Sequence, residues 1–175
     1  MILILNGSPN ASGYTGKLIK KIVTGIDEKF VILNAYDLKV LPCNDCKYCD
    51  DNEGCSQHDD MSRIYDLLES SDKLIVASPL YFASISSKLL DVITRFQTYY
   101  SKKFRRKEEV LKISKSTLIC TAGGDWETMF NGPLETMKII NMLFSVKESN
   151  NLLVRNTDTV DSLITEVTEY IEFLK

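Results

Sequence analysis

Residues 1–15 read MILILNGSPNASGYT, and three structural signals follow one another in this stretch. The first five residues are all apolar, which predicts a short buried strand. Residues 6–13 are rich in Asn, Gly, Ser and Pro, the residue types of turns, and they predict a loop. Apolar residues then recur at helical spacing at Leu18, Ile22 and Ile26, so a helix is expected from Thr15 onward.

The alternation of strand and helix continues along the rest of the chain. Apolar runs predict further strands at 30–33, 73–78, 116–121 and within 144–154. Helical spacing of apolar residues predicts helices from Met61 to Leu68, from Ile85 to Phe96, from Pro133 to Leu143 and from Val160 to Leu174. Asp59 or Asp60 is expected to cap the first of these.

Strands that are apolar on both faces and joined by crossover helices imply a parallel sheet covered on both sides. We therefore predict an α/β fold, a three-layer sandwich whose five-stranded parallel sheet has the order 2-1-3-4-5, as one domain spanning residues 1–175. Ligands of such sheets bind where the strand order reverses, beyond the carboxyl ends of strands 1 and 3. This predicts a binding site at the loops 7–15 and 79–86.

Composition and charge exclude several classes of partner. The chain has 175 residues, with 21 Lys and Arg against 24 Asp and Glu, so its formal net charge of -3 does not favour nucleic acid. The first five residues lack the basic flank and cleavage site of a signal peptide. The longest uncharged apolar stretch, from Leu74 to Ser87, is shorter than the ~20 residues that span a bilayer. We therefore expect a cytoplasmic protein without a membrane segment.

The loop after the first strand has the chemistry of a phosphate site. Its small residues and hydroxyls are followed by the free amides of a helix, which hold a phosphate without Lys or Arg. The spacing is neither GxxxxGK[ST] nor GxGxxG, which argues against a nucleoside triphosphatase and against the dinucleotide fingerprint. The alternative is an ordinary turn in which Ser12 or Thr15 caps the helix.

Three loops together resemble one family. GSPNASGYT after the first strand, SPLYFASIS after the third and TAGGD after the fourth are similar to loops of the flavodoxin-like NADPH-dependent FMN reductases and iron–sulfur flavoproteins. The resemblance implies a flavodoxin-like, FMN-binding domain. It also implies that the first loop grips the FMN phosphate through Ser8, Asn10, Ser12, Gly13, Tyr14 and Thr15. Tyr14 stands where Asn is usual, so only its amide is carried over.

The resemblance implies two further walls of the FMN site. Pro79, Leu80, Tyr81 and Phe82 would lie at the isoalloxazine ring, and Thr121, Gly123 and Gly124 would form the third wall. The alternatives are that Tyr81 and Phe82 are core aromatics and that the two glycines make an ordinary turn. In the third crossover helix the family pattern LKxFxDR keeps its arginine as Arg95, whereas Leu90 and Thr94 replace the lysine and the aspartate.

Four of the five cysteines lie in the loop 42–58, at Cys43, Cys46, Cys49 and Cys55. Thiols at this density are typical of iron–sulfur ligation, and a cytosolic setting disfavours disulfides. Iron–sulfur flavoproteins carry a compact motif of this kind before a DDM-like helix start, seen here as Asp59-Asp60-Met61. Zinc and thiols without metal are the alternatives. Cys120, in an apolar strand, is expected to be a buried core residue.

These features predict an FMN-dependent oxidoreductase of the NAD(P)H-dependent FMN reductase type, or an electron-transfer flavoprotein. A 4Fe-4S cluster would relay electrons to a small electron-carrier protein, and the chain would form a homodimer or tetramer. No catalytic acid or base is assigned, because the cofactor would supply the chemistry. The rival hypothesis is a non-enzymatic, zinc-stabilised binding module. The basic run 102–107 is interpreted as a solvated helix end, the alternative being a contact with the extra phosphate of NADPH or with an acidic protein partner.

Overall fold

The computed structural model describes residues 1–159, 161 and 165–175. Within this part of the chain, five parallel strands form one sheet in the order β2-β1-β3-β4-β5, which confirms the predicted order. The strands are β1 (Ile2–Asn6), β2 (Phe30–Asn34), β3 (Lys73–Pro79), β4 (Lys115–Thr121) and β5 (Glu148–Val154).

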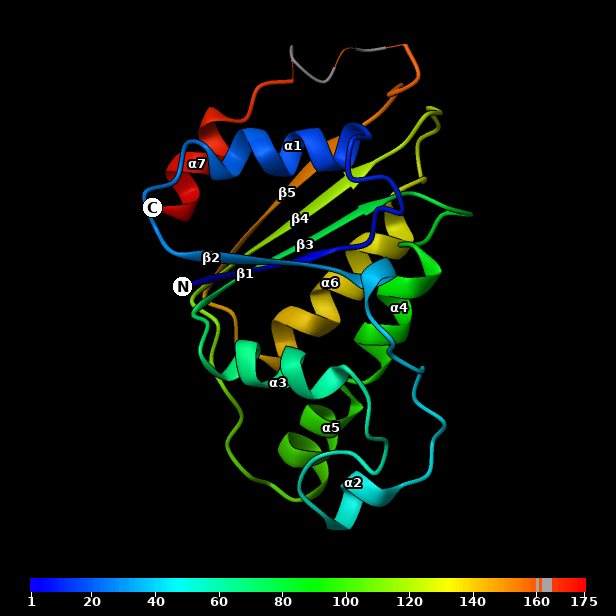
Figure 1. Cartoon of the computed structure of the whole chain (residues 1–175), viewed down its shortest axis with the longest axis vertical. Coiled ribbons are helices and arrows are strands. Elements are labelled where there is room, and N and C mark those ends of the chain that lie inside the picture. Colours follow the sequence, from blue (N-terminus) through cyan, green and yellow to red (C-terminus); the bar gives the residue numbers. More distant parts are fainter. Residues whose placement is uncertain (160, 162–164) are drawn as a thin grey trace.

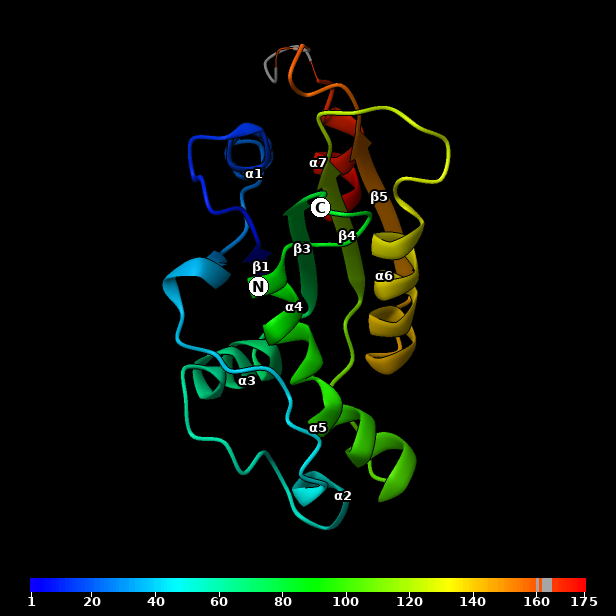
Figure 2. The same cartoon turned by 90° about the vertical axis from the view of Figure 1, so that its right-hand side faces the viewer.

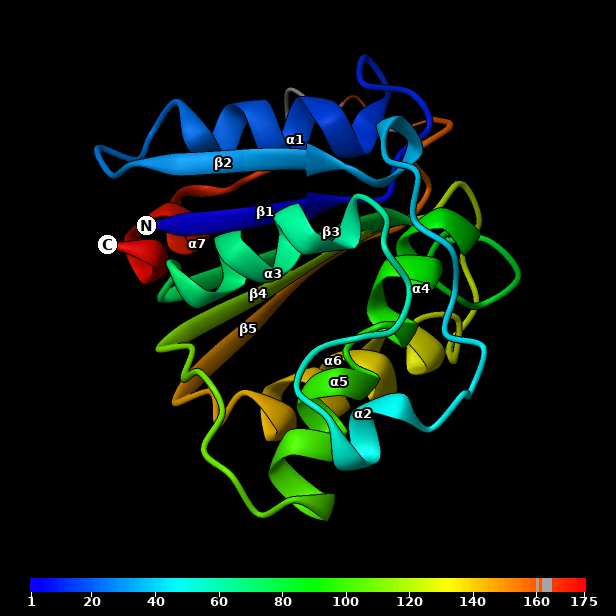
Figure 3. The same cartoon turned by 60° about the horizontal axis from the view of Figure 1, so that its bottom comes forward.

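Helices cover both faces of the sheet and produce three layers (Figure 3). One face carries α1 (Tyr14–Val23) and α7 (Thr168–Leu174), and the other carries α3 (Met61–Glu69), α4 (Ser87–Thr94) and α6 (Asn131–Leu143). Figure 2 shows α1 and α6 on opposite sides of the strands. Each face has its own apolar core, because the side chains of a central strand alternate between the two sides.

Burial differs between central and edge strands. All five residues of β1 are buried, as expected for a strand in the middle of a covered parallel sheet. The edge strand β2 exposes Phe30 and Ile32, at 38% and 41% of their surface. The prediction of burial on both faces is therefore wrong for β2, because it is an edge strand and only its face with Val31 and Leu33 packs into the core.

Three element boundaries differ from the prediction. α1 ends at Val23, before Ile26, and the helix expected from Ile85 to Phe96 is shorter, since α4 ends at Thr94 and a separate helix, α5 (Gln97–Tyr100), begins after Phe96. Of the predicted closing helix, the structure shows α7; Val160, Leu163 and Ile164 lie outside the described residues. No helix in the described part of the chain is both long and apolar enough to cross a bilayer.

Two groups of loops matter for function, and they lie in different parts of the molecule (Figure 1). The loops after β1, β3 and β4 lie in the upper half of the view, at the carboxyl ends of their strands. The cysteine loop is at the bottom and contains the short helix α2 (Tyr48–Asp51), whereas η1 (Ala35–Asp37) comes before the loop, directly after β2. Next to α2 lies the π-helix η2 (Ser101–Arg105), which continues α5.

Candidate functional site

The loops after β1, β3 and β4 enclose an open cavity of about 320 Å³, here called the strand-end cavity. Of the thirteen residues predicted for the cofactor site, ten line it, and Ser12, Phe82 and Gly124 do not. Three further residues line it that the prediction did not include. The lining residues are Ser8, Pro9, Asn10, Gly13, Tyr14, Thr15, Pro79, Leu80, Tyr81, Thr121, Gly123, Thr157 and Asp158.

The first wall is a loop that its own side chains hold in shape. The hydroxyl of Ser8 donates to the carbonyl of Asn10 (2.9 Å) and accepts from the amide of Asn10 (3.2 Å). The side-chain oxygen of Asn10 in turn accepts from the amide of Ser12 (3.0 Å). The polar side chains of this loop are therefore engaged with its backbone.

The amino end of α1 opens onto this cavity without a side-chain cap. Gly13 occupies the N-cap position and no side chain bonds to the first-turn amides, so the alternative in which Ser12 or Thr15 caps the helix is wrong. Uncapped N–H groups and the positive end of the helix dipole favour an anion at this position. Among the described residues that line the cavity there is no Lys, Arg or His, so backbone amides and hydroxyls are the groups available there to hold a negative charge.

Thr15 joins the first wall to the third. Its hydroxyl forms a 2.7 Å hydrogen bond with the hydroxyl of Thr121, and both residues are buried. The segment after β5 closes the third wall, because the amide of Thr157 donates to the carbonyl of Ala122 (3.0 Å). Gly123 lies directly against the carboxylate of Asp158, so a side chain at this position would displace that carboxylate. The sequence carried no signal for Thr157 or Asp158, since they follow an edge strand outside the predicted loops.

The second wall is a tight hairpin after β3. Tyr81 and Ser84 exchange backbone hydrogen bonds of 2.9 and 3.0 Å, and the two residues between them, Phe82 and Ala83, have φ values of 50° and 57°. Tyr81 is 46% exposed and Phe82 is fully exposed, so the alternative in which both are core aromatics is wrong. Left-handed backbone at non-glycine residues is energetically costly and is concentrated at functional sites.

The four clustered cysteines line a second, much smaller cavity of about 20 Å³, here called the cysteine cavity. Arg95, Gln97 and Thr98 form its opposite wall. All five cysteines are free thiols. Among the described residues, no three or more His, Cys, Asp or Glu side chains are arranged as a metal-ligand set. The structure thus brings the four predicted ligands into one cavity without converging their sulfur atoms.

The sulfurs of Cys43 and Cys55 accept hydrogen bonds from their own loop, whereas the thiol of Cys49 donates to the hydroxyl of Ser101 (3.5 Å). The amide of Asp45 donates to Sγ of Cys43 (3.4 Å), and the amide of Gln57 donates to Sγ of Cys55 (3.5 Å). Hydrogen bonds with Ser56 and with the backbone at Tyr48 lower the pKa of the Cys46 thiol. Such donors stabilise negative charge on sulfur. By contrast, burial in β4 raises the pKa of the Cys120 thiol to about 12, and this residue is fully buried as predicted.

The segment after α4 holds the middle of the cysteine loop. Nη1 of Arg106 donates to the carbonyls of Cys49 (2.6 Å) and Asn52 (2.8 Å), and the hydroxyl of Ser101 donates to Asp50 (2.6 Å). The interpretation of the basic run as a solvated helix end is therefore wrong for Arg106. It is also wrong for Lys103, whose ammonium donates to the last carbonyls of α6. Ser101 and Lys103 belong to the π-helix η2, and Arg106 follows its last residue.

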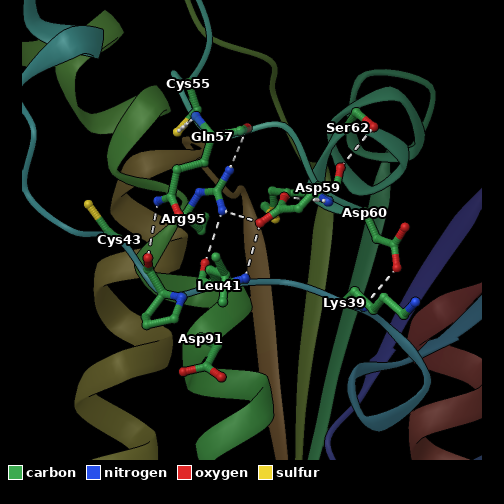
Figure 4. A network of polar contacts seen from close by, with 12 residues as sticks. Lys39, Leu41, Cys43, Cys55, Gln57, Asp59, Asp60, Ser62, Asp91 and Arg95 are labelled. Carbon is green, nitrogen blue, oxygen red and sulfur yellow. Dashed lines mark hydrogen bonds and ion pairs between the residues drawn. The ribbon is translucent and has the colours of Figure 1, made fainter.

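Two aspartates fasten the ends of the loop to the start of α3 (Figure 4). Asp59 accepts from the amide of Leu41 (3.0 Å) through Oδ2 and from that of Met61 (3.0 Å) through Oδ1. Asp60 accepts from the amide of Lys39 (2.7 Å). Asp60 occupies the N-cap position of α3, but the carboxylate that bonds to the first turn is that of Asp59.

Comparison with known proteins identifies the family of this chain. The sequence profile of the NADPH-dependent FMN reductase family matches residues 1–129, which include the cysteine loop and the loops after β1, β3 and β4. The chain belongs to this family. The predicted flavin-oxidoreductase family is thereby confirmed.

Relatives of this FMN reductase family member include iron–sulfur flavoproteins of two archaea. The one from Methanocaldococcus jannaschii is 27% identical over 97 residues, which cover 54% of this chain and 50% of the relative. The one from Archaeoglobus fulgidus is 22% identical over 130 residues, which cover 73% of this chain and 64% of the relative. The chain thus spans between half and two thirds of the length of these relatives.

Solved structures share the fold of this family member. An FMN-dependent NADH-azoreductase from Bacillus anthracis in complex with FMN superimposes with a TM-score of 0.73 at 20% identity, covering 99% of this chain and 98% of that one. An NAD(P)H:quinone oxidoreductase from Methanothermobacter marburgensis gives a TM-score of 0.72 at 15% identity, covering 93% and 87%. The flavodoxin-like architecture is confirmed by these likenesses.

Proposed function

We propose that this protein is an FMN-dependent oxidoreductase that takes electrons from NAD(P)H and binds FMN in the strand-end cavity. The observation that carries the proposal is the uncapped amino end of α1, which opens onto a cavity at the point where the strand order reverses. The site fits the group, because its free amides suit a phosphate and its exposed Tyr81 hairpin suits a flat ring.

Each part of the site would have a separate task. FMN, when bound, would supply the acceptance of hydride and the release of single electrons. The first-turn amides of α1 would hold the phosphate, and the internal hydrogen bonds of Ser8 and Asn10 would keep those amides in place. Tyr81 would cover the ring, while the buried bond between Thr15 and Thr121 holds two walls at a fixed separation.

Titration of the protein with FMN, followed by the quenching of flavin fluorescence, tests the proposal. Ser8→Ala combined with Thr15→Ala removes the hydroxyls that shape the first wall, and we expect FMN affinity to fall about tenfold, equivalent to about 1.4 kcal/mol. The matched control is Thr24→Ala, an exposed threonine at the other end of α1. Unchanged affinity in the double variant would refute the phosphate assignment, and a native chain that retains no FMN would refute the function.

The finer part of the proposal is that Cys43, Cys46, Cys49 and Cys55 hold a 4Fe-4S cluster that relays electrons to a small carrier protein. Four free thiols in one cavity and the N–H donors to two of their sulfurs support it, as do relatives named iron–sulfur flavoproteins. The donor set is of the right type, and binding a cluster would require the thiols to turn toward one another.

Anaerobic purification with analysis of iron and sulfide tests the cluster. Cys46→Ser should lose the iron and keep FMN, whereas Cys120→Ala, at a cysteine remote from the cysteine cavity, should keep both. Full retention of iron in Cys46→Ser would show that the ligands are wrongly chosen. A colourless protein that takes up zinc but not FMN would favour the zinc-stabilised module instead.

A further inference from the structure

Arg95 lies at the carboxyl end of α4, and its side chain is 1% exposed. Its Nη1 donates to the carbonyl of Leu41 (2.9 Å) and to Oδ2 of Asp59 (2.7 Å), and its Nη2 donates to the carbonyl of Gln57 (3.2 Å). Nε is also buried, and it has no hydrogen-bond partner among the described residues. Buried polar groups are nearly always paired, so this N–H requires an explanation.

Arg95 lies between the two ends of the cysteine loop (Figure 4). Leu41 comes two residues before Cys43, and Gln57 comes two residues after Cys55. By donating to both carbonyls, one guanidinium connects the two ends of the cysteine loop. Thr94, next to Arg95, accepts from the amide of Cys43 (3.2 Å) and fixes the same end of the loop.

The unpaired N–H of Arg95 lies close to the cysteine cavity. A guanidinium is planar, and its Nε–H lies along the same edge as Nη2. Nη2 donates to the carbonyl of Gln57, so the guanidinium lies against the limb of the loop that contains Cys55. Gln57 in turn donates its amide to Sγ of Cys55, and Arg95, Gln57 and Cys55 all line the cysteine cavity. The unpaired donor therefore belongs to a side chain that lines the same cavity as the cysteine sulfurs.

We propose that the Nε–H of Arg95 is a hydrogen-bond donor to the cluster bound by the four cysteines and that it raises the reduction potential of that cluster. The inference rests on the proposed cluster. Hydrogen bonds to cluster sulfurs and nearby positive charge favour the reduced form, and partners of this kind are as important to a metal site as its ligands. The loop around the cysteines carries Asp45, Asp50 and Glu53, and the charge of Arg95 is paired with that of Asp59, so the effect on the potential would come from the donated N–H.

The chain offers a matched control for this role. Arg106 also holds the cysteine loop through two carbonyls, but its Nε donates to Glu108 (2.8 Å). Arg95→Lys and Arg106→Lys therefore both remove a guanidinium that fastens the loop, and Arg95→Lys alone removes an uncommitted Nε–H. FMN binding, which depends on the strand-end cavity, serves as the measure of a folded chain.

The experiment loads the native chain and both variants anaerobically with ferrous iron and sulfide and measures the midpoint potential of the cluster. We expect Arg95→Lys to shift the potential to more negative values and to release iron to a chelator about tenfold faster. Arg106→Lys should leave the potential unchanged. Equal potentials in the two variants would overturn the role of Arg95 and leave the cluster itself standing. A native chain that binds no iron and sulfide would overturn both.

A measurement on the native sequence covers the case in which Arg95→Lys does not fold. In protein labelled with nitrogen-15 arginine, electron–nuclear double resonance on the reduced cluster should detect coupling to an arginine nitrogen, and Arg106→Lys should retain it. Absence of that coupling in the native protein would overturn the proposal.

Discussion

Asp59 is the residue on which three segments meet. Its carboxylate accepts from the guanidinium of Arg95, from the amide of Leu41 at the start of the cysteine loop and from the amide of Met61 in α3. A buried arginine and a nearly buried carboxylate are costly to remove from water, and the additional amide donors offset that cost. Loss of one partner would therefore loosen the loop, the helix and the arginine together.

The titration of Asp59 leads to a prediction about acid stability. Burial would raise the pKa of Asp59, but hydrogen bonds from Arg95, Leu41 and Met61 outweigh it and place the pKa below the ordinary value of 3.8. A lowered folded-state pKa contributes stability that is complete above the unfolded-state value and is lost as the pH falls through the folded-state value.

We therefore expect the free energy of unfolding of the native protein to fall on acidification below about pH 4. Asp59→Asn should be less stable at neutral pH, with a smaller loss in acid. Urea unfolding at a series of pH values measures this, with Asp27→Asn, at an exposed position between α1 and β2, as the control. Parallel pH profiles for native protein and Asp59→Asn would contradict the prediction.

At the scale of elements, α1 is packed against its own preceding loop. A side chain at Gly16 would collide with the backbone of Ala11, so this turn of the helix must carry glycine. The close approach brings the phosphate loop over the amino end of α1, and the uncapped first-turn amides remain within the strand-end cavity. The glycine thus shapes the site although it does not line it.

Gly16→Ala should consequently destabilise the protein, although alanine has a higher helix propensity than glycine. Alanine within a helix normally stabilises it by about 0.5–1 kcal/mol relative to glycine. Here we expect a net loss of about 1–3 kcal/mol, because the added methyl displaces the loop, together with weaker FMN binding. Thermal unfolding and FMN titration measure the two effects, with Lys17→Ala, on the exposed face of α1, as the control. A stabilised Gly16→Ala variant would show that the loop moves aside freely.

At the scale of the whole molecule, the two cavities lie at opposite ends of α4. The strand-end cavity is bordered by the Pro79–Tyr81 segment that leads into α4, and the cysteine cavity is bordered by Arg95 at its end. Eight helical residues rise about 12 Å, so a flavin and a cluster in one chain would be separated by at least this helix. On α6, the apolar side chains of Ile139 and Met142 are exposed, and Ile139 lies beside Ile93 of α4.

This separation supports the expectation that the protein is a homodimer or tetramer, in which the flavin of one subunit would lie near the cluster of another. Sedimentation should give a mass that is two or four times the 19.9 kDa of one chain. A single species at the mass of one chain, at the concentrations used for activity, would contradict this arrangement.

Local sequence patterns were sufficient for the sheet order and for most of the strand-end cavity. The apolar strands, their crossover helices and the turn residues after each strand are short-range signals, and parallel topology then brings the loops after β1, β3 and β4 to the same edge. The cysteine spacing likewise indicated one cavity, because all four thiols lie in a single loop.

Other features depend on contacts between residues far apart in the chain. Residue spacing gives no sign that Arg95 connects Leu41 and Gln57. It also gives no sign that Thr157 and Asp158 close the third wall. A buried donor needs an acceptor. Which acceptor lies within reach depends on the packing of distant segments, and no local sequence pattern encodes that packing.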